Sequence, residues 1–113
     1  MIDLDGSIIS IDELRKLYEK GSVRWTVHAL ERLQERGIKI NDIKHAIMFG
    51  KIIEQYPMDY PYPSCLVFGI DVLGGPIHIV CGIGGGFMWI ISAYRPDSDD
   101  WEPDFETRKG KKQ

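Results

Sequence analysis

The spacing of apolar and polar residues divides the chain into a helical first half and an extended second half. Up to about residue 50, apolar side chains recur every three or four positions, as on one face of an α-helix. Beyond it they run together or alternate with polar residues, as in β-strands. Helices followed by strands predict an α+β fold, in which two to three N-terminal helices pack on one face of an antiparallel sheet.

Start and stop signals divide the first half into three predicted helices. The first begins at Ser10, whose side chain is expected to form a capping box with Glu13. The second lies between Thr26, a favourable N-cap, and Gly37, which adopts a left-handed conformation after a helix at little cost. The third is expected to begin at Asn41, again as an N-cap.

The second half predicts a sheet of about four strands. Residues 51–56 form the first strand, and three prolines, which cannot donate backbone hydrogen bonds, make residues 57–63 a loop. The other strands form an antiparallel meander over residues 64–70, 76–81 and 87–94. The glycine-rich stretch 82–86 precedes a strand instead of opening a helix, which favours a wide hairpin turn over a phosphate-binding loop.

Length and composition place residues 1–113 in a single domain. With 43% hydrophobic residues the chain can bury a core, expected over about residues 10–101, followed by a frayed tail over residues 102–113. The sequence shows neither a basic-then-apolar leader nor an apolar run of about 18 residues, so we expect a cytoplasmic protein without membrane contact. Cys65 and Cys81 lie in apolar runs and are expected to be buried and reduced. No cysteines or histidines have metal-ligand spacing, so we expect neither a metal nor a cofactor.

Charge is unevenly distributed along this acidic chain. The net charge of −3 provides no overall attraction to nucleic acid, which counts against a nonspecific nucleic-acid binder. Residues 11–54 nevertheless hold nine Lys or Arg against seven Asp or Glu, whereas residues 97–106 hold acids and no base. A locally basic surface is therefore compatible with the acidic total.

The predicted helix over residues 26–37 carries the first candidate for chemistry. His28, Arg32 and either Glu35 or Arg36 recur at spacings of three and four, which places them on one side of the helix. Exposed amides at a helix start favour anions, and an imidazole beside a guanidinium can bind a phosphate and move a proton. Metal-free RNA cleavage needs this combination. The alternative is a solvated or capping histidine without a function.

Two further candidates lie in the predicted strands. His78 alternates with Ile77 and Ile79, so it is expected on the opposite sheet face, directed outward toward a groove, or else as an idle exposed histidine. Tyr94 and Arg95 end the last strand, where they can stack on a base and bind a phosphate, or form a capping aromatic and a solvated cation. Other aromatic residues near loops are each interpreted as ordinary core or rim residues, namely Trp25, Tyr56, Tyr60 and Tyr62.

The residues around His28 also carry a family resemblance. Residues 25–38 read Trp-Thr-Val-His-Ala-Leu-Glu-Arg-Leu-Gln-Glu-Arg-Gly-Ile, which is similar to the signature of the bacterial domain-of-unknown-function family 4258. Residues 76–80 and 90–96 fit the same family in the same order, and the resemblance spans about residues 23–101. It implies a fold similar to the RelE/ParE and barnase-like group, which includes ribonuclease toxins, and an antitoxin partner of the zinc-binding kind. The pI near 5.5 departs from the basic composition of ribosome-dependent toxins.

The leading hypothesis from the sequence is a metal-independent endoribonuclease toxin of a toxin–antitoxin module, with RNA as substrate. His28 would act as general base or acid, and Arg32, with Arg36 or Arg95, would neutralise the charge on the phosphorane. His78 or Tyr94 would supply a second proton-transfer group or a stacking surface. Trp25 is a further candidate for contact with the substrate.

Two other classes of function remain open at this stage. The chain can instead be a non-catalytic interaction module of the same fold, in which Arg32 and Arg36 pair with acids on an antitoxin-like partner. It can also be a structural domain of a larger assembly.

Overall fold

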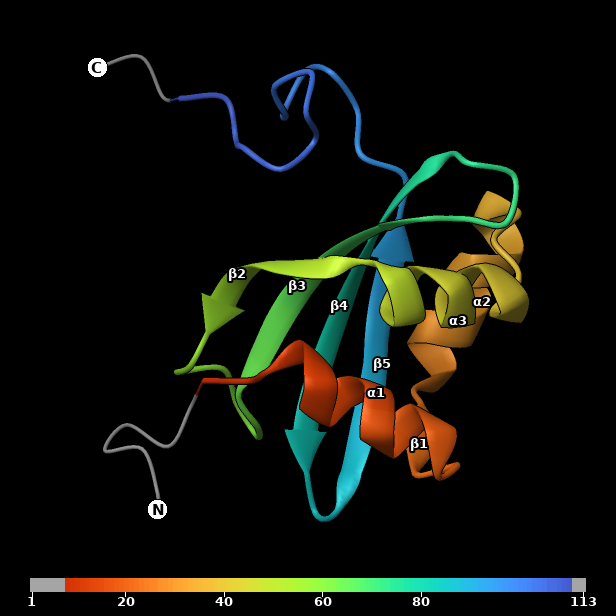
Figure 1. Cartoon of the computed structure of the whole chain (residues 1–113), viewed down its shortest axis with the longest axis vertical. Coiled ribbons are helices and arrows are strands. Elements are labelled where there is room, and N and C mark those ends of the chain that lie inside the picture. Colours follow the sequence, from red (N-terminus) through yellow and green to blue (C-terminus); the bar gives the residue numbers. More distant parts are fainter. Residues whose placement is uncertain (1–7, 111–113) are drawn as a thin grey trace.

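The computed structural model describes residues 8–110 and shows helices packed against a sheet (Figure 1). Within that range the chain forms three helices and five strands. In chain order they are α1 (Ile11–Glu19), β1 (Val23–Trp25), α2 (Val27–Arg36), α3 (Ile40–Phe49), β2 (Lys51–Tyr56), β3 (Ser64–Ile70), β4 (Pro76–Gly84) and β5 (Phe87–Tyr94). The predicted α+β class is confirmed.

The predicted N-cap residues of α1 and α2 are confirmed, although the structure shows only the Ser10 half of the capping box predicted with Glu13. The Ser10 hydroxyl accepts a hydrogen bond from the backbone N–H of Glu13 at 3.1 Å. The Thr26 hydroxyl accepts one from the N–H of Ala29 at 2.9 Å. Gly37 ends α2 in the left-handed region, with φ of 66°. The Ser10 and Thr26 side chains each accept a hydrogen bond from a backbone N–H that the helix itself leaves without a partner.

The predicted start of α3 at Asn41 is wrong. The helix begins at Ile40, one residue before the expected cap. The reason is that the Asp42 carboxylate reaches back and accepts a hydrogen bond from the backbone N–H of Lys39 at 2.9 Å. The side chain that accepts this hydrogen bond therefore belongs to a residue inside the first turn. A prediction from N-cap preference considers only the residue just before the helix.

The sheet differs from the predicted one in its first strand. Its order within the described residues is β1-β5-β4-β3-β2. Strand β1 pairs with β5 in parallel, Val23 opposite Met88 and Trp25 opposite Ile90, so the sheet is mixed and has five strands. The prediction missed β1 because a strand of three residues is too short to show the alternation of apolar and polar residues.

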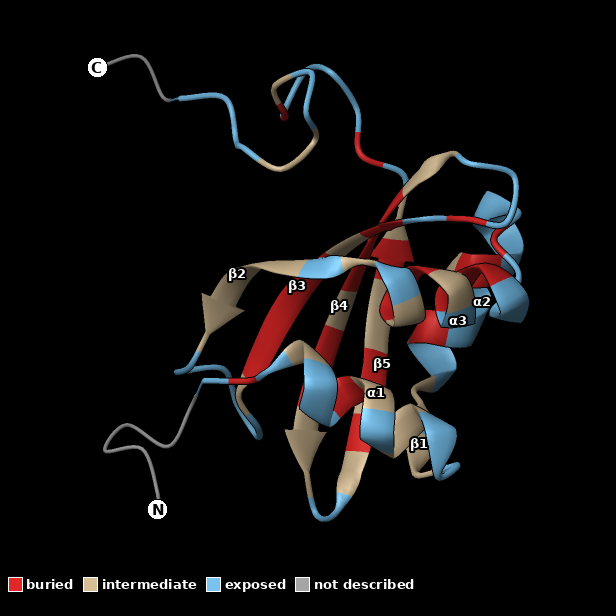
Figure 2. Ribbon diagram, in the orientation of Figure 1, coloured by how far each residue is buried: buried red, intermediate tan, exposed pale blue. Residues whose placement is uncertain are grey.

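One face of the sheet holds the hydrophobic core. Ile77 and Ile79 of β4 are fully buried together with Leu14, Leu33 and Ile43 from the three helices. Figure 2 shows this band of buried positions along β3, β4 and β5, with exposed positions on the outer sides of the helices. Burial of such aliphatic side chains is the main favourable contribution to folding.

The cysteines belong to this same core. Cys65 on β3 lies directly opposite Cys81 on β4, and both are free and buried, as predicted. Burial raises the pKa of the Cys65 thiol to about 12, so its thiolate is scarce at neutral pH. Both cysteines are thus packing residues rather than nucleophiles.

The opposite face is covered by the C-terminal segment (residues 97–109). Trp101 is 3% exposed, and its backbone pairs with Arg108 in an isolated bridge. The Arg108 guanidinium donates to both carboxylate oxygens of Glu54 on β2, at 2.8 and 3.2 Å. The expectation of a frayed tail is therefore wrong for residues 102–110, because an aromatic and an ion pair hold them; residues 111–113 lie outside the described range.

The glycine-rich stretch is partly strand. β4 continues to Gly84, so the hairpin turn contains Gly85 and Gly86, both with positive φ. The prediction of a hairpin is confirmed, with a tighter turn than expected. Among the helices of residues 8–110, none is both long enough and apolar enough to cross a bilayer.

Candidate functional site

Helix α2 presents His28 and Arg32 differently to solvent. His28 lies exposed in the first turn of the helix, two residues after the capping residue Thr26. Arg32, one turn further on, is about one third exposed and forms an ion pair with Glu35 at 3.0 Å. The predicted pair is therefore present on one helix. Its histidine is accessible, while its arginine already has a carboxylate partner.

Helix α2 runs beside β5 in the same direction. At its start, the N–H of Thr26 donates to the carbonyl of Ile90 at 3.3 Å. At its end, the Arg36 guanidinium donates to the carbonyl of Ala93 at 2.7 Å. His28, Arg32 and Arg36 recur every fourth residue between these points, and we call them the α2 row. At 1.5 Å per residue, the row is about 12 Å long.

The far end of the α2 row opens into a shallow hollow. This hollow, of about 560 Å³, is lined by Arg36, Tyr94, Arg95 and Asp97, and we call it the β5-end hollow. The structure thus brings together three residues that the sequence selected on two distant segments. Its charge is mixed, because Asp97 lines it and Arg95 pairs with the Asp71 carboxylate at 2.8 Å.

Asp71 is held in place for this ion pair. Its carboxylate accepts hydrogen bonds from the N–H groups of Gly75 at 2.7 Å and Leu73 at 2.9 Å. These backbone bonds, together with Arg95, lower the pKa of Asp71 below its ordinary value. The carboxylate therefore stays charged and fixes one edge of the Arg95 guanidinium.

His78 is buried, contrary to the expectation that it faces a groove. It does lie on the predicted sheet face, but Trp101 packs against its ring at 4.5 Å between centroids. Its Nε2 is 2.7 Å from the carbonyl oxygen of Phe105, and its Nδ1 is 3.2 Å from the hydroxyl of Tyr94. The C-terminal segment covers it because Trp101 and Phe105 both fold back onto the sheet.

These contacts define the protonation of His78. A carbonyl oxygen only accepts hydrogen bonds, so Nε2 carries the proton and Nδ1 accepts from the hydroxyl of Tyr94. Burial lowers the pKa of His78, although the bond to Phe105 opposes that change. Burial also raises the pKa of Tyr94. His78 is thus a neutral group that orients Tyr94, and direct contact with a substrate requires the C-terminal segment to move.

Trp25, predicted as a candidate for contact with the substrate, lies in a strand of the sheet. It lies on β1 and is partly buried against the hydrophobic core. Its backbone pairs with Ile90 on β5. Trp25 therefore helps to anchor the start of α2, which begins two residues later, to the sheet.

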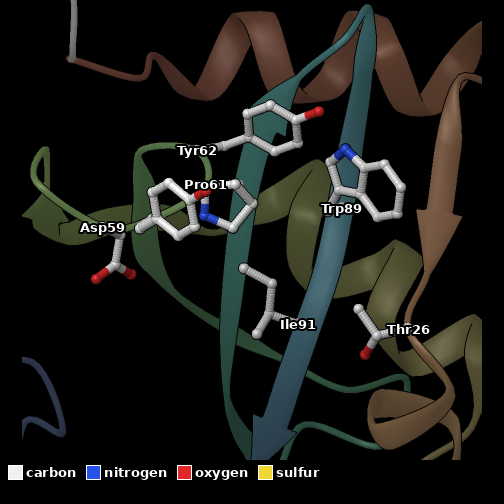
Figure 3. Close-up of a pocket in the computed structure, with 8 residues that line it drawn as sticks. Thr26, Asp59, Pro61, Tyr62, Trp89 and Ile91 are labelled. Atoms are coloured by element: carbon white, nitrogen blue, oxygen red, sulfur yellow. The ribbon is translucent and has the colours of Figure 1, made fainter.

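An aromatic pocket lies at the near end of the α2 row. Its volume is about 400 Å³, and Thr26, the residue before α2, is one of its walls (Figure 3). The other lining residues are Asp59, Tyr60, Pro61, Tyr62, Gly82, Trp89 and Ile91. This site was not predicted from the sequence, because each of its aromatic residues, taken singly, is typical of an ordinary rim residue. What could have indicated a pocket is that several aromatic residues lie in one proline-rich loop, opposite a strand that contains Gly82 and Gly84.

The described residues show no metal cluster. Across residues 8–110, no three His, Cys, Asp or Glu side chains gather closely enough to hold an ion. The groups that this part of the molecule offers for chemistry are an exposed imidazole, guanidinium groups, a phenol and an aromatic pocket. These are groups that bind anions and planar rings and that transfer protons.

Comparison with known families identifies the segment that carries these features. The model of a domain of unknown function, DUF4258, matches residues 25–95. The chain belongs to this family. The DUF4258 segment begins at Trp25 and ends at Arg95, so it includes the α2 row and His78 and excludes the segment that covers His78. No curated protein and no solved structure matches the chain.

Proposed function

We propose that this DUF4258 protein is a metal-independent endoribonuclease that acts as the toxin of a bacterial toxin–antitoxin module. The observation that carries the proposal is the α2 row, in which an exposed histidine and two arginines follow strand β5 into the β5-end hollow. The family resemblance implies a fold like that of the RelE/ParE and barnase-like group, and a sheet with helices on one face is compatible with it. RNA is the substrate in this proposal.

His28 has the central chemical role in the proposal. It takes the proton of a 2′-hydroxyl as O2′ bonds to the adjacent phosphorus, the P–O5′ bond breaks, and water protonates the departing O5′. The products are a 2′,3′-cyclic phosphate and a 5′-hydroxyl. The Arg32 guanidinium leaves its ion pair with Glu35, binds the scissile phosphate and neutralises the negative charge of the phosphorane.

Arg36 and Arg95 bind a neighbouring phosphate rather than the scissile one. Arg36 lies about 12 Å from His28 along the helix axis, beyond the hydrogen-bond reach that proton transfer requires. Tyr94, which shares the hollow with Arg36, is for the same reason a binding group in this proposal. His78 orients the Tyr94 hydroxyl and is not the second proton-transfer group.

The test is cleavage of a 5′-labelled single-stranded RNA by the purified chain, with the product ends identified. We expect a cyclic phosphate in the presence of a chelator, and a loss of rate of about 10²–10⁴-fold in His28→Ala, the usual contribution of a general base. His45→Ala is the matched control, because His45 lies on α3 outside the α2 row. Uncut RNA with the wild-type chain, or full activity in His28→Ala, would reject the proposal.

Growth on expression provides the cellular counterpart. The wild-type chain is expected to stop growth, and His28→Ala to leave it unaffected while its thermal melting temperature stays unchanged. An antitoxin-like protein, of the zinc-binding kind implied by the family resemblance, is expected to restore growth when co-expressed. A wild-type chain that is harmless without any such protein would contradict the toxin assignment.

A second candidate function is supported by an apolar surface near α3. Phe49 is 74% exposed and Leu73 93% exposed, with Ile70 and Val72 also exposed nearby in the chain. Exposed apolar residues in this number are typical of surfaces that bind proteins. In this candidate the protein is a non-catalytic module that binds an antitoxin-like partner. The wild-type chain should then co-purify with the partner and leave RNA uncut, and Phe49→Ser should lose the partner.

A further inference from the structure

The aromatic pocket has walls that are fixed before any ligand arrives. The Trp89 indole N–H donates to the carbonyl of Gly84 at 3.2 Å, which holds the indole in place. The ring of Tyr62 lies 6.2 Å from that of Trp89, tilted by 30°. Figure 3 shows these two rings above Ile91, with Thr26 beyond the indole. A rigid aromatic wall needs little ordering when a ring binds.

Glycines on β4 make room for these rings. A Cβ atom on Gly84 would lie 2.0 Å from the Tyr62 ring, so any side chain there would displace the tyrosine. A Cβ on Gly82 would lie 3.1 Å from the carbonyl oxygen of Pro63. The strand therefore approaches the loop closely at two positions of the same face, and the pocket opens above Gly82.

Tyr60 is the unusual member of the pocket. It lines the cavity and yet is 95% exposed, so the fold gains little apolar burial from it. The Asp59 carboxylate beside it accepts a hydrogen bond from the Ser64 hydroxyl. The pocket thus combines a free aromatic face with polar atoms at its edge, including the hydroxyl of Thr26.

We propose that this pocket binds one unpaired nucleobase of the RNA strand. Flat aromatic faces stack on any base, and hydroxyl and carboxylate oxygens at the edge can bond to its polar atoms. A volume of about 400 Å³ is within the range of small-molecule sites. The proposal rests on the proposed ribonuclease function and names the part of the substrate that this pocket would take.

The position of the pocket gives the strand a path. Thr26 lines the pocket and is also the N-cap of α2, so the pocket lies at the start of the α2 row. From there the row extends about 12 Å toward the β5-end hollow. A short single strand can thus place a base in the pocket, a phosphate at His28 and the next phosphates toward the β5-end hollow.

The experiment measures binding without cleavage. Homohexamers of each of the four bases with 2′-O-methyl sugars lack the attacking hydroxyl, and a hexamer without bases serves as the backbone control. We expect at least one base-containing hexamer to bind more tightly than the backbone control. Tyr60→Ala should raise its Kd by about 5- to 140-fold, which corresponds to about 1–3 kcal/mol of stacking. Tyr60→Phe should retain the affinity.

Leu73→Ala is the matched control, because Leu73 is as exposed as Tyr60 and does not line the pocket. Equal binding of the backbone control and the hexamers, or equal affinity in Tyr60→Ala and Leu73→Ala, would overturn the proposal. The two proposals fail separately. If Tyr60→Ala loses base-dependent binding and the wild type does not cleave RNA, the pocket proposal is upheld and the ribonuclease proposal is rejected. If the wild type cleaves RNA and Tyr60→Ala binds as tightly as the wild type, the ribonuclease proposal is upheld and the pocket proposal is rejected.

Discussion

The two faces of the sheet are covered in different ways. The helix face is closed by aliphatic side chains from three helices, with Ile77, Ile79 and Ile90 fully buried against them. The other face is covered in parts, by a proline-rich loop at one end and by the C-terminal segment at the other. Stability is concentrated on the first face, and the second retains a pocket and a covered polar pair. The difference separates the residues that hold the fold from those available for binding.

The largest expected effect is on the helix face. Ile79→Ala leaves a cavity in a fully buried position and is expected to reduce the free energy of unfolding by about 2–5 kcal/mol. Urea denaturation followed by circular dichroism measures the change. The same substitution at Ile70, which is 42% exposed, should change it by no more than about 0.5 kcal/mol. Equal losses at both positions would remove the distinction between core and surface.

A smaller loss is expected on the other face. Trp101→Ala removes the side chain that covers His78 and should cost about 1.5–3 kcal/mol, the value of burying one large apolar side chain. Hydrogen exchange should show residues 101–109 losing protection while β4 and β5 retain theirs. Loss of protection throughout the sheet would instead make the C-terminal segment part of the main core.

The buried His78 predicts a dependence of stability on pH. Its pKa is lowered by burial in the folded state, so below about pH 6.5 the unfolded chain binds a proton that the folded chain resists. The free energy of unfolding should therefore be fully present above pH 6.5 and decrease toward pH 5, by at most about 1.4 kcal/mol per pH unit. Urea titrations at several pH values test this.

Matched variants assign that dependence to one residue. His78→Gln cannot take up the proton and should show a smaller pH slope, although it is less stable at pH 8. His28→Ala is the control, because it removes a different histidine, one that lies on α2. A slope that persists in His78→Gln and disappears in His28→Ala would contradict the assignment.

The smallest expected effect concerns the ion pair of the C-terminal segment. Glu54→Gln weakens the contact with Arg108, whose side chain is 56% exposed, and should cost about 0.2–1 kcal/mol. Salt should reduce the difference between wild type and variant, because screening weakens exposed pairs. A loss as large as that in Trp101→Ala would show that the ion pair, not the indole, holds the segment.

Local signals in the sequence were sufficient for most of the fold. Thr26 and Gly37 limit α2 by short-range backbone chemistry, and the alternation around His78 gave its sheet face. Strand β1 was missed because its identity depends on pairing with β5, which no local pattern contains. The same limit explains α3, whose start depends on the reach of one carboxylate, that of Asp42.

The candidate site was predictable to the extent that it lies on one element. His28 and Arg32 were found by spacing along a helix, and the convergence of Arg36 with Tyr94 required the packing of α2 on β5. The burial of His78 could not be predicted, because Trp101 and Phe105 reach it only through the tertiary packing of the C-terminal segment, and Phe105 lies in the tail that was expected to fray.

The parallel pairing of β1 with β5 has a consequence for how the chain is made. Strand β5 contacts α1, α2, β1 and β4, and it follows the other four described strands in the chain. Helix α3 packs on β3 and can bury its apolar face earlier, whereas α2 has no strand to pack on until β5 has left the ribosomal exit tunnel. Long-range pairing of this kind makes folding slow and leaves the unfinished chain open to aggregation or chaperone binding. The surface that joins α2 to β5 therefore forms only after β5 has been synthesised.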